Sequence, residues 1–359
     1  GTAIGSHDVP FTITTDRSWM TVTPSTTMIP PGGTNVIVTS NPQGLSTGTN
    51  TGSIVVAQSG GSPSNVPFSV NIVTPVSPQP KTPPRDALVI PAVAHADGIG
   101  SLWQSDIRVT NIATHAITYD LTFTPSGVDG SIVGRKTRIT IESGETKALD
   151  DVVKQWYGLG SLGDGTNGVL EIRPAPSGKQ HAATSVERFS TVASSRTYNN
   201  TPDGTYGQWI PAIPFGEFVG RDAGDGSSVL SMQHIAQSSR FRTNLGLVEG
   251  AGAEATVLIS VFDHTGQKAT EFTVDLKAME HQQLNSVLAT RDIVLENGRI
   301  EAKVVDGQGR ITAYASVIDA LTNDPIFVPG VNASSIAAVR YVVPGLADLD
   351  TGVNCWRSD

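Results

Sequence analysis

The chain contains an internal repeat, and this feature constrains the fold more than any other. Residues 103–109 read WQSDIRV, and residues 241–247, 138 positions later (241 − 103), read FRTNLGL. Both follow the order aromatic, any residue, Ser or Thr, Asp or Asn, aliphatic. Later matches occur at shorter shifts, down to 130 positions between residues 170–172 and 300–302. Small loop deletions explain this decrease, so the repeat predicts two homologous domains.

The ends of the repeated unit set the expected domain boundaries. WIPA at residues 209–212 matches FVPG at residues 327–330. We therefore expect the first repeat over residues 87–209 and the second over residues 210–330.

The C-terminal segment 331–359 resembles the start of a third copy. VPG at residues 343–345 and WRSD at residues 356–359 match IPA at residues 90–92 and WQSD at residues 103–106. This match stops where the first long strand of a unit begins, so we expect the protein to continue beyond Asp359.

Within each unit, apolar residues alternate with polar ones, as at residues 117–124 and 272–277. A period of two predicts strands with one buried and one solvated face. The expected fold class is all-β: tandem antiparallel β-sandwich (immunoglobulin-like) domains, with one short helix in each repeated unit. In the first unit we expect Asp150 to cap a helix over residues 151–157 that stops at Gly158, and Asn285 offers the same cap in the second.

Residues 1–74 have a different pattern and read as a separate domain of five strands separated by polar turns. The expected strands are residues 11–15, 19–23, 35–39, 53–56 and 66–72. The proline-rich segment 75–86 reads as an extended linker between this domain and the repeats.

The first domain resembles a known family. SWMTVTP at residues 18–24 and GLSTGTNTGSI at residues 44–54 are similar to the BACON-type immunoglobulin-like repeat of secreted bacterial proteins. The resemblance implies an extracellular spacer or a carbohydrate-associated module. The strands that would precede Phe11 in a complete domain of this type are missing, so we expect residues 1–74 to be an N-terminally incomplete sandwich.

The repeats also show a resemblance. SRTYN at residues 195–199 and GTYGQWIP at residues 204–211 are similar to uncharacterised repeats in large exported bacterial proteins. That resemblance implies an extracellular or cell-surface location and no particular activity.

Composition narrows the function classes further. The net charge is −9, from 33 acidic and 24 basic residues scattered along the chain. This balance argues against nucleic acid or an anionic membrane surface as a partner. No apolar run is long enough for a membrane helix, and the first residues lack the pattern of a signal peptide. Cys355 is the single cysteine, so no disulfide framework can form within the chain.

The sequence holds one motif with the spacing of a dinucleotide-binding turn, the GLGSLG at residues 158–163. It follows a predicted helix rather than a strand, so we interpret it as a loop. Two carboxylate-bearing turns, at residues 222–226 and 348–352, offer oxygen ligands for Ca²⁺, but neither supplies a full set. We interpret both as solvated turns.

Histidines give no metal or catalytic pattern. None has a second histidine or cysteine at ligand spacing, and we expect all of them to be isolated surface or turn residues. The seven are His7, His95, His115, His181, His234, His264 and His281. No nucleophile motif accompanies them, although a convergent triad would escape a linear reading. We therefore predict no catalytic, cofactor-binding or metal-binding residues.

Two aromatic features bear on binding. Trp103, Phe241 and Trp356 recur at one repeat position and are expected to anchor the core rather than form a carbohydrate platform. Arg196 and Tyr198 form a candidate binding pair. The second unit has Val317 and Asp319 at the aligned positions, so a function common to both units does not depend on this pair.

The preferred interpretation is a non-catalytic extracellular bacterial protein that spaces, adheres or assembles. Residues 339–346 form a spare apolar strand that would pair with a neighbouring subunit and build a head-to-tail filament by strand addition. The alternative is a carbohydrate-binding or spacer region of a secreted hydrolase, with surface glycans as partners. An enzyme with a convergent site is the third class, and a deep pocket holding paired catalytic groups would favour it.

Overall fold

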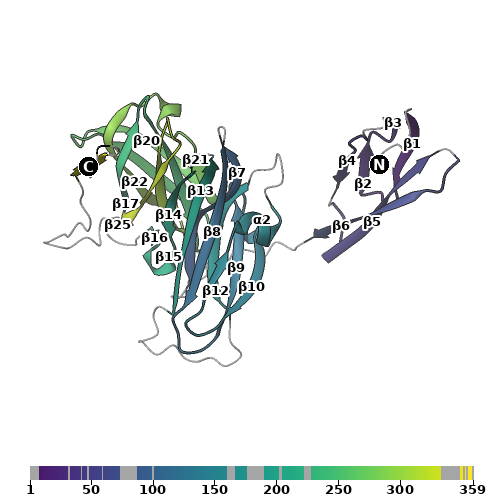
Figure 1. The fold of residues 1–359 in the computed structure, drawn as a ribbon, viewed down its shortest axis with the longest axis horizontal. Helices are drawn as coiled ribbons and strands as arrows, with labels where there is room; N and C mark the ends of the chain where they lie inside the picture. The colour runs from purple at the N-terminus through teal and green to yellow at the C-terminus, as the bar shows by residue number, and fades with distance from the viewer. Residues whose placement is uncertain are drawn as a thin grey trace. The chain divides into compact units, whose positions relative to one another are not determined.

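The computed structural model divides the chain into two compact units, Gly1–Val76 and Ser77–Asp359 (Figure 1). The residues that the structure describes are 8–30, 33–41, 43–46, 48–58, 60–72, 87–98, 101–159, 166–175, 190–201, 204–221, 228–332, 348–350, 352 and 355–357.

The first unit is built from antiparallel strands in two small sheets. One sheet has the order β3-β1-β5-β6 and the other pairs β2 with β4. Ile13, Met20 and Ile29 are buried apolar side chains among its described residues. All five expected strands are present, together with β3, which sequence reasoning missed. The strands are β1 (Val9–Thr15), β2 (Met20–Thr23), β3 (Thr26–Ile29), β4 (Ile37–Ser40), β5 (Gly48–Gln58) and β6 (Ser64–Ile72).

The first repeat is a two-layer structure whose strands all pair antiparallel. One layer has the order β10-β9-β12-β7-β15 and the other β11-β8-β13-β14, and β7 pairs with β8 where the layers meet. Its strands are β7 (Leu88–Gly98), β8 (Ser101–Asn111), β9 (Ile117–Pro125), β10 (Arg135–Ile141), β11 (Thr146–Leu149), β12 (Thr166–Pro174), β13 (Thr191–Thr201), β14 (Gly204–Pro211) and β15 (Ile213–Pro214).

The second repeat has two separate five-stranded sheets with the same connections. One sheet has the order β20-β19-β22-β17-β25, and the other contains β16-β23-β18-β21, with β24 also paired to β23. Its strands are β16 (Val219–Gly220), β17 (Leu230–Gln237), β18 (Phe241–Glu249), β19 (Ala255–Phe262), β20 (Lys268–Leu276), β21 (His281–Leu284), β22 (Leu295–Gly307), β23 (Arg310–Asp319), β24 (Pro325–Pro329) and β25 (Val331–Asn332).

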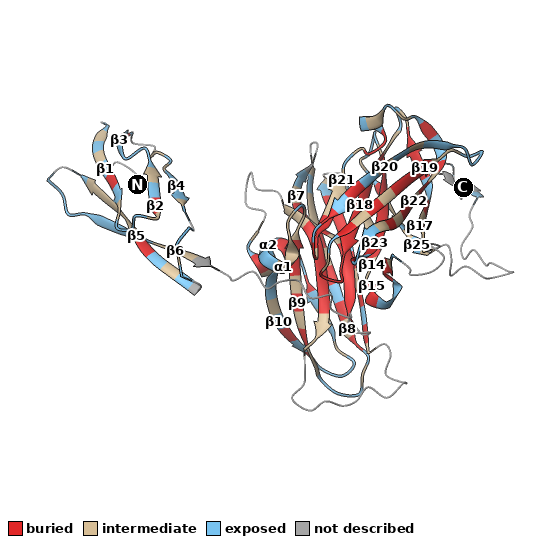
Figure 2. Cartoon of the chain, turned by 180° about the vertical axis from the view of Figure 1, so that it is seen from behind, coloured by how far each residue is buried: buried red, intermediate tan, exposed pale blue. Residues whose placement is uncertain are grey.

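The two repeats have the same pairing scheme. Strand β8 lies between β11 and β13 as β18 lies between β21 and β23, and β9 lies between β10 and β12 as β19 lies between β20 and β22. The alternating apolar side chains of each repeat fill a separate core between its two layers. Figure 2 shows buried residues along β18 and β19, whereas the outer strands β10 and β20 are mostly exposed or intermediate. The expected all-β architecture is therefore confirmed.

Strand pairing also fixes where each repeat ends. Ile213 pairs with Val89, and Val331 pairs with Ser231 at the corresponding place in the second repeat. Each unit thus extends a few residues past 209 and 330. Beyond Asn332, the structure describes only a two-stranded pairing of β26 (Asp348–Asp350) with β27 (Cys355–Arg357), together with Gly352. Residues 339–346 and the linker 75–86 lie outside the described residues.

The helices are short, and the N-terminal caps expected at Asp150 and Asn285 are wrong. The first repeat has α1 (Gly130–Val133) and α2 (Val152–Tyr157), and the second has the 3₁₀ turns η1 (Phe215–Glu217) and η2 (Ala289–Arg291). Gly158 ends α2 in the left-handed conformation, as expected. In the described part of the chain, no helix is long and apolar enough to cross a membrane.

The residue that precedes α2 is Asp151 rather than Asp150, and its side chain makes no capping hydrogen bond. Asp151 has a φ of 43° and directs its carboxylate to His95, while the Asp150 carboxylate pairs with Arg108. In the second repeat, Asn285 accepts a hydrogen bond from Gln283 and caps no helix. The capping preference of Asp and Asn failed to predict these helix starts because the side chains form hydrogen bonds or ion pairs with other residues instead.

A shared junction joins the two repeats within the second unit. Val248 of β18 joins one apolar cluster with residues of the first repeat and the connecting turn: Ala87, Val89, Val169, Ile213, Phe215 and Phe218. The rings of Phe215 and Phe218 stack at 4.8 Å. Apolar burial of this kind resists separation, so the two repeats form one body rather than beads on a string.

Backbone hydrogen bonds also fix the alignment of the two repeats at the junction. The amide of Gly127, in the β9–β10 connection, donates to the carbonyl of His281 at 2.8 Å, and the amide of Gly130 donates to that of Ala278 at 3.0 Å. At the other side of the junction, Ser316 donates to the Gln208 side chain at 3.1 Å. The outer face of sheet β21-β18-β23-β24 is therefore buried against the first repeat.

Candidate functional site

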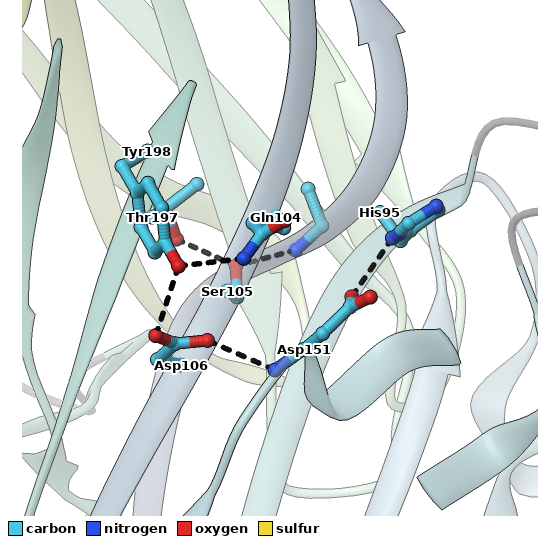
Figure 3. A network of polar contacts seen from close by, with 8 residues as sticks. His95, Gln104, Ser105, Asp106, Asp151, Thr197 and Tyr198 are labelled. Atoms are coloured by element: carbon cyan, nitrogen blue, oxygen red, sulfur yellow. Dashed lines mark hydrogen bonds and ion pairs between the residues drawn. The ribbon is translucent and has the colours of Figure 1, made fainter. Parts of the chain in front are cut away.

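A histidine–carboxylate pair is the feature of the first repeat that most resembles part of an active site (Figure 3). His95 Nδ1, near the end of β7, lies 2.8 Å from Asp151 Oδ1. Both side chains are largely buried. A carboxylate that orients an imidazole is two thirds of a nucleophile-activating triad. Among the described residues, no hydroxyl or thiol hydrogen-bonds the other ring nitrogen of His95.

Asp106 on β8 is the centre of the surrounding network. Its Oδ1 accepts a hydrogen bond from the Asp151 amide at 2.9 Å, and its Oδ2 accepts one from the Tyr198 hydroxyl at 3.1 Å (Figure 3). The Tyr198 hydroxyl also accepts from Gln104 Nε2 at 2.6 Å. Burial, with Asp106 adding to the effect, raises the pKa of Tyr198. Both Asp106 oxygens are thus occupied by groups of the chain itself.

Hydroxyl groups tie the inner side of the same strands together. Ser105 Oγ accepts from the Ala94 amide at 2.8 Å and lies 2.7 Å from Thr197 Oγ1. Both Ser105 and Thr197 are buried. These contacts connect β7, β8 and β13, so the hydroxyls serve strand alignment rather than a bound molecule.

The second repeat shows which part of this network is structural. Asn244, at the position of Asp106, accepts a hydrogen bond through Oδ1 from the Ser286 amide at 2.9 Å. Ser286 and Asp151 both have positive φ, 47° and 43°. The register of β17 against β22 places Gln237 where the first repeat has His95. Both repeats therefore have a hydrogen bond from the amide of a positive-φ residue to the side chain of Asp106 or Asn244, which we call the backbone clamp. The His95–Asp151 pair belongs to the first repeat alone.

A second buried histidine lies at the junction. His281 Nε2 is 3.0 Å from the Tyr314 hydroxyl, which donates to Gln283 Oε1 at 3.1 Å. This arrangement assigns the Nε2–H tautomer. His281 Nδ1 is buried without a hydrogen-bond partner among the described residues. Burial lowers the pKa of His281 to about 4, so the ring is neutral at neutral pH.

Glu249 is a buried carboxylate whose partners are all backbone amides. It accepts from Ala251 at 2.6 Å, Met279 at 2.8 Å, Gly252 at 2.9 Å and Arg310 at 3.0 Å. Burial raises its pKa, and these amides act in the opposite direction. The carboxylate joins three chain segments of the second repeat, which is a structural role.

The structure corrects the expectation for histidines. His95 and His281 are buried and paired rather than isolated at the surface. His264 lies in an exposed turn, as expected, whereas His7 and His181 lie outside the described residues. No signal in the sequence could have found the His95–Asp151 pair, because 56 positions separate the two residues.

The other sequence candidates lie mostly outside the described residues. Gly158 ends α2, while residues 160–165 and 222–226 lie outside the described part of the chain. Asp350 Oδ1 accepts from the Gly352 amide at 2.8 Å, as a solvated turn does. Across the described residues, no group of three His, Cys, Asp or Glu side chains could hold a metal ion.

The recurring aromatics and the Arg196–Tyr198 pair have separate outcomes. Phe241 packs against the core of the second repeat as predicted, and Trp103 is half-buried on β8. Arg196 lies over the Tyr198 ring, 4.5 Å from its centroid. The earlier alignment of this pair was wrong by one residue. Strand register matches the two positions to Ser316 and Ile318.

Comparison with known proteins gives no family. No family model matches the chain, and no curated protein matches its sequence. The resemblance of residues 1–74 to the BACON-type repeat therefore stays a prediction.

Among solved structures, the chain is similar to Bacteroides uniformis β-glucuronidase 2 covalently bound to cyclophellitol-6-carboxylate aziridine. That match has 11% identity and a TM-score of 0.16 over 73% of this chain, and it spans 28% of the glucuronidase chain. The coconut allergen cocosin matches with 9% identity and a TM-score of 0.15, over 88% of this chain and 87% of its own. At TM-scores this low, neither similarity bears on the function of this chain.

Proposed function

We propose that the chain is a non-catalytic extracellular bacterial protein in which joined β-sandwich repeats act as a rigid spacer or adhesive element. The repeat junction is the observation that carries this proposal. A spacer must hold its length, and a junction made of a shared apolar cluster and backbone hydrogen bonds resists bending between repeats.

The polar groups inside the repeats support the same proposal. The hydrogen bond that Asp106 accepts has a counterpart at Asn244, and no histidine–carboxylate pair accompanies it there among the described residues. If this hydrogen bond served only catalysis at the His95–Asp151 pair, the second repeat, which lacks that pair, would not need it. The His95–Asp151 pair then serves to hold the corner before α2.

Assembly by strand addition is an extension of this proposal. It rests on residues 339–346, which lie outside the described residues. Negative-stain microscopy of the concentrated chain, compared with a variant carrying proline at Val342, tests that extension, because proline removes the amide that a strand ladder needs. Filaments that persist unchanged in the proline variant would contradict strand addition.

Incubation of the purified chain with polysaccharides, esters and peptides tests the non-catalytic claim. We expect no turnover. Any turnover that His95→Gln removes, while the fold of the variant is retained, would contradict the proposal. Labelling of intact producing cells with a membrane-impermeant reagent tests the extracellular location. A chain that stays unlabelled on intact cells would contradict it.

A further inference from the structure

The outer face of sheet β11-β8-β13-β14 in the first repeat corresponds to the face that the junction buries in the second. In the second repeat this face carries Thr312, Tyr314 and Ser316, all buried. Strand register places Val192, Ser194 and Arg196 at the same positions of the first repeat, where Val192 and Arg196 are exposed and Ser194 is half-buried.

The side chains on this open face do not fit a second copy of the junction. Gly246 is required in the second repeat because a Cβ atom there would lie 2.0 Å from the Tyr314 ring. The corresponding residue of the first repeat is Arg108, which forms an ion pair with Asp150 at 2.7 Å. Charged side chains in place of glycine are typical of the polar outer face of a terminal repeat. This polar face would not bury against another repeat as the junction does.

Two exposed apolar side chains, Val192 and the much larger Trp209, depart from that polar pattern. Trp209 on β14 is 64% exposed. Its counterpart, Phe327, packs against the core of the first repeat and stacks on Tyr314 at 5.3 Å. Protection of a terminal repeat from aggregation calls for a polar residue here, so an exposed indole ring indicates a binding role.

Trp209 lies directly opposite Arg196 in the β13–β14 pairing. Cross-strand neighbours have Cβ atoms about 5 Å apart, so the two side chains leave adjacent strands side by side on one face. Arg196 has no carboxylate within ion-pair distance among the described residues, unlike Arg108. Its charge is available to an anion from solution.

The arginine is held in place by the network below it. Arg196 lies over the Tyr198 ring and also donates to Thr205. Tyr198 is fixed in turn by Asp106 and Gln104. Gly207 allows β14 to lie close to Tyr198, because a Cβ atom there would lie 2.5 Å from Tyr198 Cβ. A preorganised cation loses little side-chain entropy on binding.

We propose that Trp209 and Arg196 bind a glycan that contains a carboxylated sugar. The indole ring provides a flat apolar surface for the C–H face of a sugar ring, and Arg196 provides a two-pronged donor for the sugar carboxylate. A nucleic acid would need several cations, whereas this face offers one unpaired arginine on a chain of net charge −9. The site adds to the spacer role and does not depend on it.

Affinity electrophoresis of the full chain through gels containing polygalacturonate, a polymer of carboxylated sugars, tests this proposal, with dextran as the neutral counterpart. We expect retardation by polygalacturonate and none by dextran. Trp209→Ala and Arg196→Gln are each expected to weaken binding at least about 10-fold. Leu321→Ala and Arg221→Gln change exposed residues elsewhere in the same unit and are expected to bind as the wild type does.

Several outcomes would overturn the proposal. Absence of retardation by polygalacturonate, or retardation that both site variants keep, removes the site. If dextran retards the chain as much as polygalacturonate does, and Arg196→Gln has no effect, the sugar carboxylate is not the group that the site recognises. Self-association of the chain that Trp209→Ala abolishes, without polysaccharide binding, assigns the face to a second copy instead. Unfolding midpoints of the variants, expected to match the wild type, show that loss of binding is not loss of fold.

Discussion

Asp106 and Asn244 make the same hydrogen bond in the two repeats. Each accepts, through a side-chain oxygen at 2.9 Å, the amide of a residue with positive φ that follows the short strand β11 or β21. Such a residue leaves the strand in a conformation that L-amino acids rarely adopt, so its amide needs a fixed acceptor. The Asp or Asn of the repeat motif supplies this acceptor.

The first prediction concerns this clamp. Asp106→Ala leaves the Asp151 amide and the Tyr198 hydroxyl without their acceptor and should lower the free energy of unfolding by about 2–3 kcal/mol. Asp106→Asn, which reproduces the second repeat, should cost about 1 kcal/mol or less. Urea unfolding measures both. Asp150→Ala is the control, because it removes only an exposed ion pair and should change stability by about 0.5 kcal/mol. Equal losses for Asp106→Ala and Asp150→Ala would show that no clamp exists.

The second prediction concerns the pH dependence of stability. Burial lowers the pKa of His281 from the ordinary histidine value of 6.5 to about 4 in the folded protein, so the unfolded chain binds the proton first as pH falls. The folded state therefore loses stability as pH falls from about 6.5 to about 4, by at most about 1.4 kcal/mol per pH unit from this group. In His281→Gln that contribution disappears.

The control for this measurement is His264→Gln, since His264 lies in an exposed turn. Chemical unfolding at a series of pH values gives the slopes. A His281→Gln slope equal to those of the wild type and of His264→Gln would contradict the burial of a neutral imidazole at the junction.

The third prediction concerns Glu249. Glu249→Gln places amide hydrogens where the carboxylate now accepts from five backbone amides, so we expect a loss of about 3 kcal/mol in the free energy of unfolding. Glu254→Gln, an exposed neighbour, should be nearly neutral. Comparable midpoints for the two variants in thermal unfolding would argue against the buried carboxylate.

The fourth prediction concerns the repeat junction. A Cβ atom at Gly130 would lie 2.4 Å from the Met279 carbonyl oxygen, so Gly130→Ala must push the repeats apart. We expect faster hydrogen exchange at the Gly127 amide and a loss of about 1–3 kcal/mol. Gly216→Ala is the matched control, since no atom lies within 4 Å of the Cβ position there. Unchanged exchange at Gly127 in the Gly130 variant would disprove the close contact.

Sequence reasoning found what is local and periodic. The alternation in residues 117–124 and 272–277 predicted strands, and the motif around Asp106 and Asn244 aligned the repeats correctly, because both signals lie within one strand. The alignment of Arg196 was off by one residue because the connection before β13 is longer than the one before β23, and a loop of different length hides the register.

Sequence reasoning could not find contacts between distant segments. The Asp150 cap failed because the Asp150 carboxylate pairs with Arg108 and that of Asp151 pairs with His95, both distant in the chain. The junction could not be predicted for the same reason. The need for glycine at position 130 follows from the close approach of Met279, which lies far away in the chain. Exposure of Trp209 also followed only from the structure, because a tryptophan in an alternating strand is ordinarily expected to face the core.

The central claim is that the two repeats form one rigid body. Its most direct test is the distance distribution between spin labels on Lys136 and Thr273, exposed residues of β10 and β20, in a Cys355→Ser background. We predict a single narrow distribution that broadens in Gly130→Ala. A broad distribution in the parent chain, unchanged by the glycine substitution, would mean that the repeats move independently and would contradict the claim.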